Sequence, residues 1–193
     1  MRKDRLLAFT DGVFAIIITI MVLELKVPHD DGWGGLLKVA PTLLSYVLSF
    51  IYVAIYWNNH HHMFETVQRV NGATLWANMY LLFWLSLIPF ATAWLGETHH
   101  APVPAAVYGF VLLMPAIGYY VLQYVLISVH EANATLAEAL GSDWKGKISI
   151  LLYVAGIALA FVNPWVSIGL YVLVALVWLV PDRRIERVVA KGE

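Results

Sequence analysis

The sequence predicts an all-α integral membrane protein with six transmembrane helices in each subunit. Two observations lead to this fold class. Hydrophobic residues make up 61% of the 193-residue chain and charged residues 13%, whereas a soluble domain is about 45–50% apolar and about a quarter charged. The apolar residues also gather into six segments that approach or exceed the ~20 residues a helix needs to cross the ~30 Å hydrocarbon core.

We expect these helices within a single domain, residues 1–193, at about 6–25, 36–60, 72–95, 104–129, 146–162 and 165–181. The last two are short, and the tight turn at Asn163-Pro164 joins them. Pro89 and Pro115 should each kink the helix that contains it, because proline has no N–H to bond the carbonyl four residues earlier. The polar connector 130–143, HEANATLAEALGSD, could form a short surface helix.

The distribution of Lys and Arg predicts the orientation in the membrane. If the N-terminus is cytoplasmic, only Lys26 and Lys38 face the outside. The cytoplasmic side then carries Arg2, Lys3, Arg5, Arg69, Lys145, Lys147, Arg183, Arg184, Arg187 and Lys191. Cytoplasmic loops carry the excess of positive charge in membrane proteins. We therefore expect both termini on the cytoplasmic side.

The first helix, within RLLAFTDGVFAIIITIMVLEL at residues 5–25, presents two different faces. Ile16, Ile20 and Leu23 follow the i, i+4, i+7 spacing and form one stripe, which Thr19 borders. Such a stripe usually faces lipid or the protein core. In an oligomer it could instead supply apolar rings that constrict a pore and gate it by dewetting. The spacing alone leaves both interpretations open.

Asp11 lies five residues before Ile16 and therefore points about 140° away from that stripe. A carboxylate within a spanning helix is either part of a functional site or a satisfied node that clamps the helix to its neighbours. We favour the clamp, because Asp11 does not share the direction of the stripe. The candidate partners are Arg5, Thr10, His60, His61 and Asn78.

The stretch WNNHHHMFE, residues 57–65, closes the second helix and raises the question of a metal. His61 and Glu65 have a workable i, i+4 spacing, but consecutive histidines point about 100° apart on a helix and do not converge on one ion. The chain also has no cysteine. We therefore expect no metal site here, and a pH-sensitive hydrogen-bond node is the preferred interpretation.

Several of these residues together resemble the transmembrane protein 175 family, which comprises lysosomal potassium channels and their prokaryotic homologues. The first-helix signature of that family, R-x-x-x-F-S-D-G-V-F-A-I, is matched by Arg5 and by residues 9–16, FTDGVFAI, with Thr10 in place of the usual serine. The second-helix pattern is matched by Trp57, His60, His61 and Phe64, and the third by Asn78, Pro89, Phe90 and Thr92. The specific matches cover residues 5–95.

The resemblance implies a homotetramer of single six-helix subunits in a prokaryotic plasma (inner) membrane, with the first helix lining a central pore. Carried over by position, Ile16, Ile20 and Leu23 would form apolar constriction rings with Thr19 as their polar neighbour. An intrasubunit network would hold the helix in place through Arg5, Thr10, Asp11, His60 or His61, and Asn78. We expect no enzymatic activity, no cofactor, no bound metal and no nucleic-acid partner.

We therefore expect passive, modestly selective K⁺ flux through the bilayer, with other monovalent cations also permeating. Glu24, Asp30 and Asp31 would attract cations to an outer vestibule. One alternative is a proton-coupled secondary transporter that uses Asp11 and the second-helix histidines as a relay. A second is an intramembrane metalloenzyme built on His60, His61 and Glu65.

Overall fold

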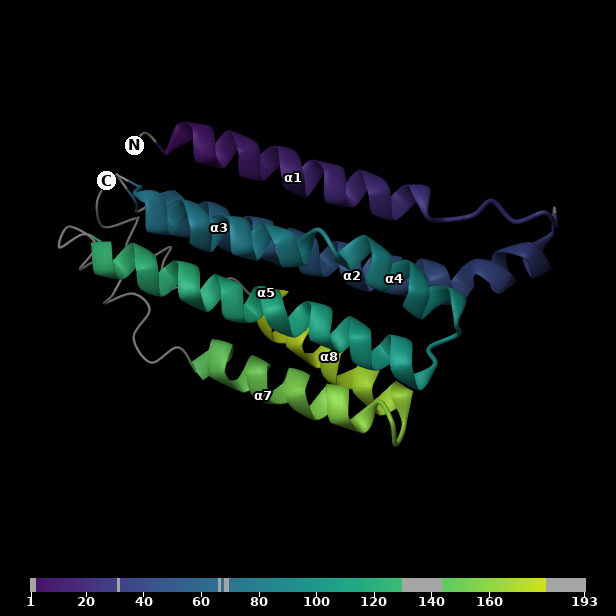
Figure 1. Ribbon diagram of the computed structural model, residues 1–193. Helices are drawn as coiled ribbons and strands as arrows, with labels where there is room; N and C mark the ends of the chain where they lie inside the picture. Colours follow the sequence, from purple (N-terminus) through teal and green to yellow (C-terminus); the bar gives the residue numbers. More distant parts are fainter. Residues whose placement is uncertain (1–2, 31, 66, 68–69, 130–143, 180–193) are drawn as a thin grey trace.

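The computed structural model describes residues 3–30, 32–65, 67, 70–129 and 144–179. Every regular element among these residues is an α-helix, which confirms the predicted fold class. In chain order the helices are α1 (Asp4–Leu23), α2 (Trp33–Glu65), α3 (Gly72–Leu85), α4 (Ile88–Glu97), α5 (Pro102–Val129), α7 (Trp144–Leu159) and α8 (Pro164–Leu179) (Figure 1). The connector 130–143, for which a surface helix was considered, lies outside the described residues.

The helices run side by side as a bundle, with α1 on one flank and α7 on the opposite flank (Figure 1). α1 packs against α2, α3 and α4, whereas α5 packs against α3, α4, α7 and α8. α1 and α7 begin at the same end of the bundle, which we call the amino-terminal end (Figure 1). Lys3, next to the first residue of α1, and Lys147, in the first turn of α7, therefore lie there. α1 ends and α2 begins at the opposite end (Figure 1). Lys26 follows the end of α1 and Lys38 lies near the start of α2. These four lysines are therefore divided between the two ends of the bundle.

Four stretches are long and apolar enough to cross a membrane: α1, α2, the pair α3 and α4 taken together, and α5. α8, with 16 residues, is shorter, about 24 Å. α2 starts and ends beyond its predicted bounds of 36 and 60, and its 33 residues span about 50 Å. Its extension beyond residue 60 carries the polar residues His61, His62 and Glu65, because a helix can continue into the interface after its hydrophobic part ends.

The predicted third helix is divided into α3 and α4 at Ser86 and Leu87. The N–H of Leu87 bonds the carbonyl of Trp84, only three residues back, so the backbone tightens at this point. Pro89 occupies the first turn of α4, where a missing N–H costs little. α5, by contrast, continues through Pro115. Of the two prolines expected to distort a helix, Pro89 coincides with a break and Pro115 does not.

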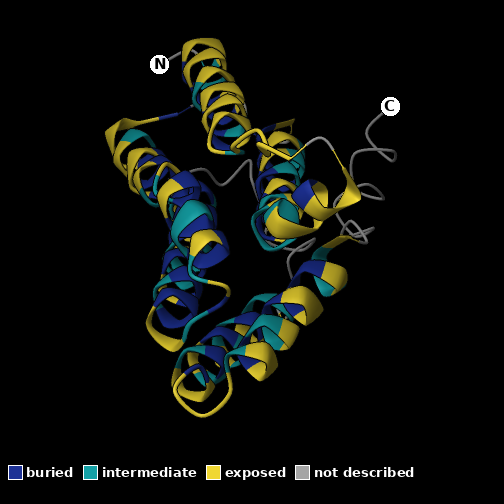
Figure 2. Ribbon diagram, turned by 90° about the vertical axis from the view of Figure 1, so that its right-hand side faces the viewer, coloured by how far each residue is buried: buried dark blue, intermediate teal, exposed yellow. Residues whose placement is uncertain are grey.

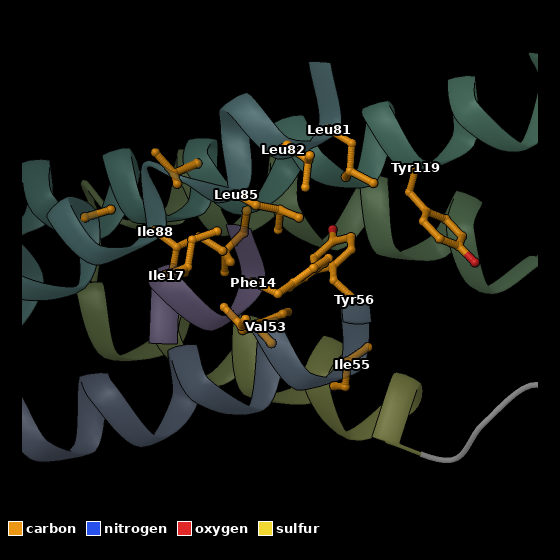
Figure 3. Packing of buried hydrophobic residues seen from close by; sticks show 14 of the residues in the cluster. Phe14, Ile17, Val53, Ile55, Tyr56, Leu81, Leu82, Leu85, Ile88 and Tyr119 are labelled. Carbon is orange, nitrogen blue, oxygen red and sulfur yellow. The ribbon is translucent and has the colours of Figure 1, made fainter. Parts of the chain in front are cut away.

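Figure 3 shows the apolar core where α1 meets the other helices. Phe14 and Ile17 of α1 lie among side chains such as Val53 on α2, Leu85 on α3 and Ile88 on α4. Each of these five side chains is buried. Figure 2, which is turned by 90° from Figure 1, shows that α1, the helix beside the N label, is exposed around most of its circumference. α1 therefore attaches to its subunit along a single face.

The far side of the bundle packs around Tyr171 of α8. Its ring lies so close to Gly109 on α5 and Gly156 on α7 that an added Cβ at either glycine would approach it within 2.5 Å or less. The Tyr171 hydroxyl donates to the carbonyl of Ala105 at 3.2 Å. The Tyr52 hydroxyl of α2 donates to the Tyr171 carbonyl at 2.5 Å. These contacts bind α8 to α2, α5 and α7.

Candidate functional site

α1 has one buried stripe and a broad exposed surface. The buried positions are Leu6, Thr10, Phe14, Ile17 and Met21. They follow the i, i+3, i+4 spacing of a helix face that packs against neighbours. Helical geometry then places the remaining residues on two flanks of this stripe, and the predicted pore-lining residues and Asp11 fall on different flanks.

Ile16, Ile20 and Leu23 lie together on one flank and are exposed, by 60%, 42% and 75% respectively. Phe9, two turns before Ile16, continues the same flank and is 53% exposed. Thr19 is also exposed, and its hydroxyl donates to the carbonyl of Ala15 at 2.8 Å. No helix of the described subunit covers these side chains. The isolated subunit therefore presents an exposed apolar surface along most of the length of α1.

A chain of buried hydrogen bonds joins the packed face of α1 to α3 and α2. The Asn78 side-chain amide donates to the Thr10 hydroxyl at 2.9 Å. The carbonyl oxygen of Asn78 consequently faces His60, whose Nε2–H donates to it at 2.8 Å. All three side chains are at most 2% exposed. One amide therefore pairs a histidine and a hydroxyl that would otherwise be buried without partners.

Asp11 lies on the other flank of α1, where its carboxylate accepts a 2.9 Å hydrogen bond from the Trp57 indole of α2. The indole ring stacks on His61, with 5.6 Å between the ring centroids. Asp11 is exposed in the subunit, because it lies about 100° from the buried Thr10 around the helix. Its hydrogen-bond partner is Trp57, which was not among the candidates.

The six residues expected to form one network are therefore separated. Thr10, Asn78 and His60 are bonded to one another, whereas Asp11 and His61 each contact Trp57. Arg5 is exposed and forms no hydrogen bond or ion pair with any described residue. The amino-terminal end gains a different contact, since the Lys3 ammonium donates to the Phe64 carbonyl at 2.9 Å. A cation at the C-terminus of α2 complements the helix dipole.

The three consecutive histidines point to different surroundings. His60 faces inward to Asn78, while His61 Nε2 and His62 Nδ1 lie 3.3 and 3.1 Å from the carboxylate of Glu65. Across the described ranges, no three His, Cys, Asp or Glu side chains gather closely enough to hold a metal ion. The arrangement of these groups is that of polar side chains in contact with one another at a helix end.

The acidic residues expected near an outer vestibule have unequal surroundings. Glu24 caps α1 and is exposed. Asp30 pairs with Lys38, 2.5 Å between Oδ2 and Nζ, so its charge is largely compensated. Asp31 lies outside the described residues. Lys26 pairs with Glu97 at the end of α4, and this hydrogen bond raises the pKa of Lys26.

A second series of hydrogen-bonded side chains was not predicted from the sequence. The Tyr108 hydroxyl lies 2.9 Å from Ser49 Oγ, which lies 2.6 Å from Thr92 Oγ1. Because the Thr92 hydroxyl donates to the Ile88 carbonyl, Ser49 donates to Thr92 and Tyr108 donates to Ser49. The chain links α5, α2 and α4. Its only signal in the sequence was the presence of small hydroxyl residues within apolar helices.

The sequence and the fold were then compared with known proteins. The model of the family "Endosomal/lysosomal potassium channel TMEM175" matches residues 5–89. A potassium channel of Chryseobacterium is 57% identical, over 97% of each chain, and one of Streptomyces collinus is 35% identical, over 90% of each. The crystal structure of a lysosomal potassium-selective channel TMEM175 homologue from Chamaesiphon minutus superposes with a TM-score of 0.78, at 32% identity, and the match covers 93% of this chain and 97% of that one.

These relatives are channels, not enzymes, and they match this chain over nearly its whole length. The chain belongs to the family of the potassium channel TMEM175.

Proposed function

We propose that this protein is a potassium channel in which four subunits bring their α1 helices together around a central pore. The observation that carries the proposal is the exposed stripe of Ile16, Ile20 and Leu23, which no described helix of the subunit covers. Relatives at 57% and 35% identity are named potassium channels, and the similar crystal structure is described as potassium-selective. An unpaired apolar stripe on a helix of such a protein suits a ring of identical subunits.

In this proposal the permeant ion crosses three apolar rings. Because isoleucine and leucine side chains offer no ligand to replace bound water, the ion keeps part of its hydration shell. Selectivity then favours cations that lose water easily, so K⁺, Rb⁺ and Cs⁺ pass more readily than Na⁺. The same rings close the pore by dewetting when they approach one another. Phe9, on the same flank and nearer the amino-terminal end, adds an aromatic ring to this path.

The buried contacts of α1 hold the stripe toward the pore. The hydrogen bonds from Asn78 to Thr10 and from His60 to Asn78 fix the rotation of α1 against α2 and α3. The bond from Trp57 to Asp11 fixes it from the other flank. A carboxylate on the pore-distal flank therefore serves orientation and not ion binding.

The charges at the ends of the bundle suggest how the subunit sits in the membrane. We place the amino-terminal end, with Lys3 and Lys147, in the cytoplasm and Lys26 and Lys38 outside, in accordance with the positive-inside rule. Both chain termini are then cytoplasmic, in a prokaryotic plasma membrane. At the outer mouth Glu24 attracts cations more strongly than Asp30, since Lys38 neutralises Asp30.

Flux measurements on purified protein in liposomes test this proposal. K⁺-loaded vesicles in Na⁺ buffer should release K⁺ passively, with single-channel openings in planar bilayers and a permeability order that places K⁺, Rb⁺ and Cs⁺ above Na⁺. Crosslinking and mass measurement should give four subunits. A saturating flux that requires a pH gradient and shows no unitary openings would instead establish the proton-coupled transporter.

A further inference from the structure

The side of the bundle away from α1 contains a cavity that the pore does not use. It has a volume of about 130 Å³ and lies where α2, α5, α7 and α8 meet. Its walls are largely aromatic, from Tyr52, Tyr56, Tyr119, Tyr153 and Trp178. For comparison, an engineered apolar cavity of about 150 Å³ in another protein holds one benzene molecule. The space here accepts a short apolar group about the size of six carbon atoms.

The cavity opens near the amino-terminal end of the bundle. Gln123 lies close to the end of α5, Lys147 close to the start of α7 and Trp178 at the end of α8, and all three line the cavity. Tyr52 and Tyr153 lie further along their helices, toward the middle of the bundle. The cavity therefore extends inward from the depth at which lipid headgroups meet acyl chains.

Polar atoms are placed along this otherwise apolar path. The Gln123 side chain, only 6% exposed, and the Tyr56 hydroxyl form no hydrogen bond with any of the residues that the structure describes. Both side chains line the cavity. Lys147 is exposed and is the cationic residue of the lining. Lys145, two residues earlier on α7, lies with its ammonium 5.9 Å from the centre of the Trp178 ring.

This combination fits an occupant with a negatively charged head and an apolar tail. We infer that the cavity is a binding site for an anionic phospholipid of the adjacent leaflet, with a segment of one acyl chain against the tyrosine rings and the phosphate at Lys147. Basic residues at pockets between transmembrane helices bind anionic headgroups, and lysine provides a positive charge of the required kind. The unpaired amide of Gln123 and the Tyr56 hydroxyl lie where the glycerol ester groups would reach them.

Lipid retention by the purified channel tests the site. Native mass spectrometry would titrate the detergent-solubilised protein with phosphatidylglycerol or with phosphatidylcholine of the same acyl chains. The wild type should retain about one phosphatidylglycerol per subunit, saturably, and should prefer it to phosphatidylcholine. Lys147→Gln should weaken phosphatidylglycerol about fivefold, the effect of one lysine near a membrane surface. Lys38→Gln, at the opposite end, is the control and should change nothing.

A second variant tests whether the acyl chain of the lipid occupies the cavity. Ala116→Phe should fill the cavity and weaken both lipids, because residue 116 lines it. Ala158→Phe places the same ring at an exposed position of α7 and should leave binding unchanged. Circular dichroism and gel filtration of each variant separate loss of binding from loss of folding. Wild-type affinity in either folded Lys147→Gln or folded Ala116→Phe, or equal retention of the two lipids by the wild type, would overturn the assignment.

Discussion

The side-chain amide of Asn78 on α3 donates a 2.9 Å hydrogen bond to the hydroxyl of Thr10 on α1. The same side chain accepts a 2.8 Å hydrogen bond from His60 on α2. Three helices therefore meet at one buried amide, on the face of α1 that lies opposite its exposed surface. These hydrogen bonds therefore determine which side of α1 faces away from the subunit.

Replacing Asn78 with Leu should destabilise the subunit by about 1–2 kcal/mol, because Thr10 and His60 are left buried without partners. Leucine has a similar shape, so the loss of packing is small. Thermal unfolding in detergent would measure the change. Ser128→Ala, which removes an exposed hydroxyl of α5, is the control. Equal stability of Asn78→Leu and the control would show that the node does not hold α1.

The pair of Asp11 and Trp57 lends itself to a double-mutant cycle. Asp11→Ala removes the acceptor, and Trp57→Phe removes the indole N–H while keeping a ring against His61. We expect a coupling of about 0.5–1.5 kcal/mol in stability, reduced by the exposure of Asp11. Both single variants should also weaken tetramer assembly and leave ion selectivity unaltered once assembled. Additive effects, or altered selectivity in an intact Asp11→Ala tetramer, would refute the anchoring role.

Gly109 should tolerate no side chain. A Cβ there would lie 1.9 Å from the Tyr171 hydroxyl, so Gly109→Ala should cost about 1–3 kcal/mol through overpacking. Gly169, on α8, has nothing within 4 Å of the equivalent Cβ. Gly169→Ala should therefore be neutral or slightly stabilising, since alanine favours helix. Melting temperatures of the two variants compare them directly, and similar values would mean that α5 and α8 are not closely packed.

Acidification should destabilise the turn between α4 and α5. His100 is 7% exposed, lies 3.3 Å from Ser45 Oγ, and has its pKa lowered below 6.5 by burial and then by the charge of His99. The unfolded imidazole takes up a proton at a higher pH than the folded one. The folded state therefore loses stability as the pH falls below about 6.5.

The free energy of unfolding, measured between pH 8 and pH 5, would reveal this loss of stability. His100→Gln should flatten the pH dependence, and His29→Gln, at an exposed position near the same end of the bundle, should leave it as in the wild type. If both substitutions behave alike, His100 does not contribute to the pH response.

Helical periodicity separates Ile16 from Asp11 around α1, because the direction of each side chain follows the 3.6-residue repeat. Ile16 and Asp11 do point in different directions, and both lie off the buried stripe. The same periodicity could not say whether His60 or His61 faces α3. That choice depends on the rotation of α2 against α1 and α3, which only tertiary packing fixes.

The sequence around a residue predicts effects within one helical turn, but not contacts between segments that are distant in the chain. Pro89 was expected to kink the third helix, and the structure has a break near Leu87, within one turn of the missing N–H. Trp57 as the partner of Asp11 is a contact between residues 46 apart, and the sequence around either one gives no sign of it. The cavity beside Tyr153 is likewise formed by four helices, and no single segment encodes it.

Single-channel recording of Ile16→Asn tests the central claim most directly. An amide in the constriction supplies ligands and water, so the variant should conduct more current and distinguish K⁺ from Na⁺ less well than the wild type. Val22→Asn, 44% exposed on the other flank of α1, is the matched control and should behave as the wild type. Wild-type conductance and selectivity in Ile16→Asn, or the same change in Val22→Asn, would contradict a pore lined by the stripe of Ile16, Ile20 and Leu23.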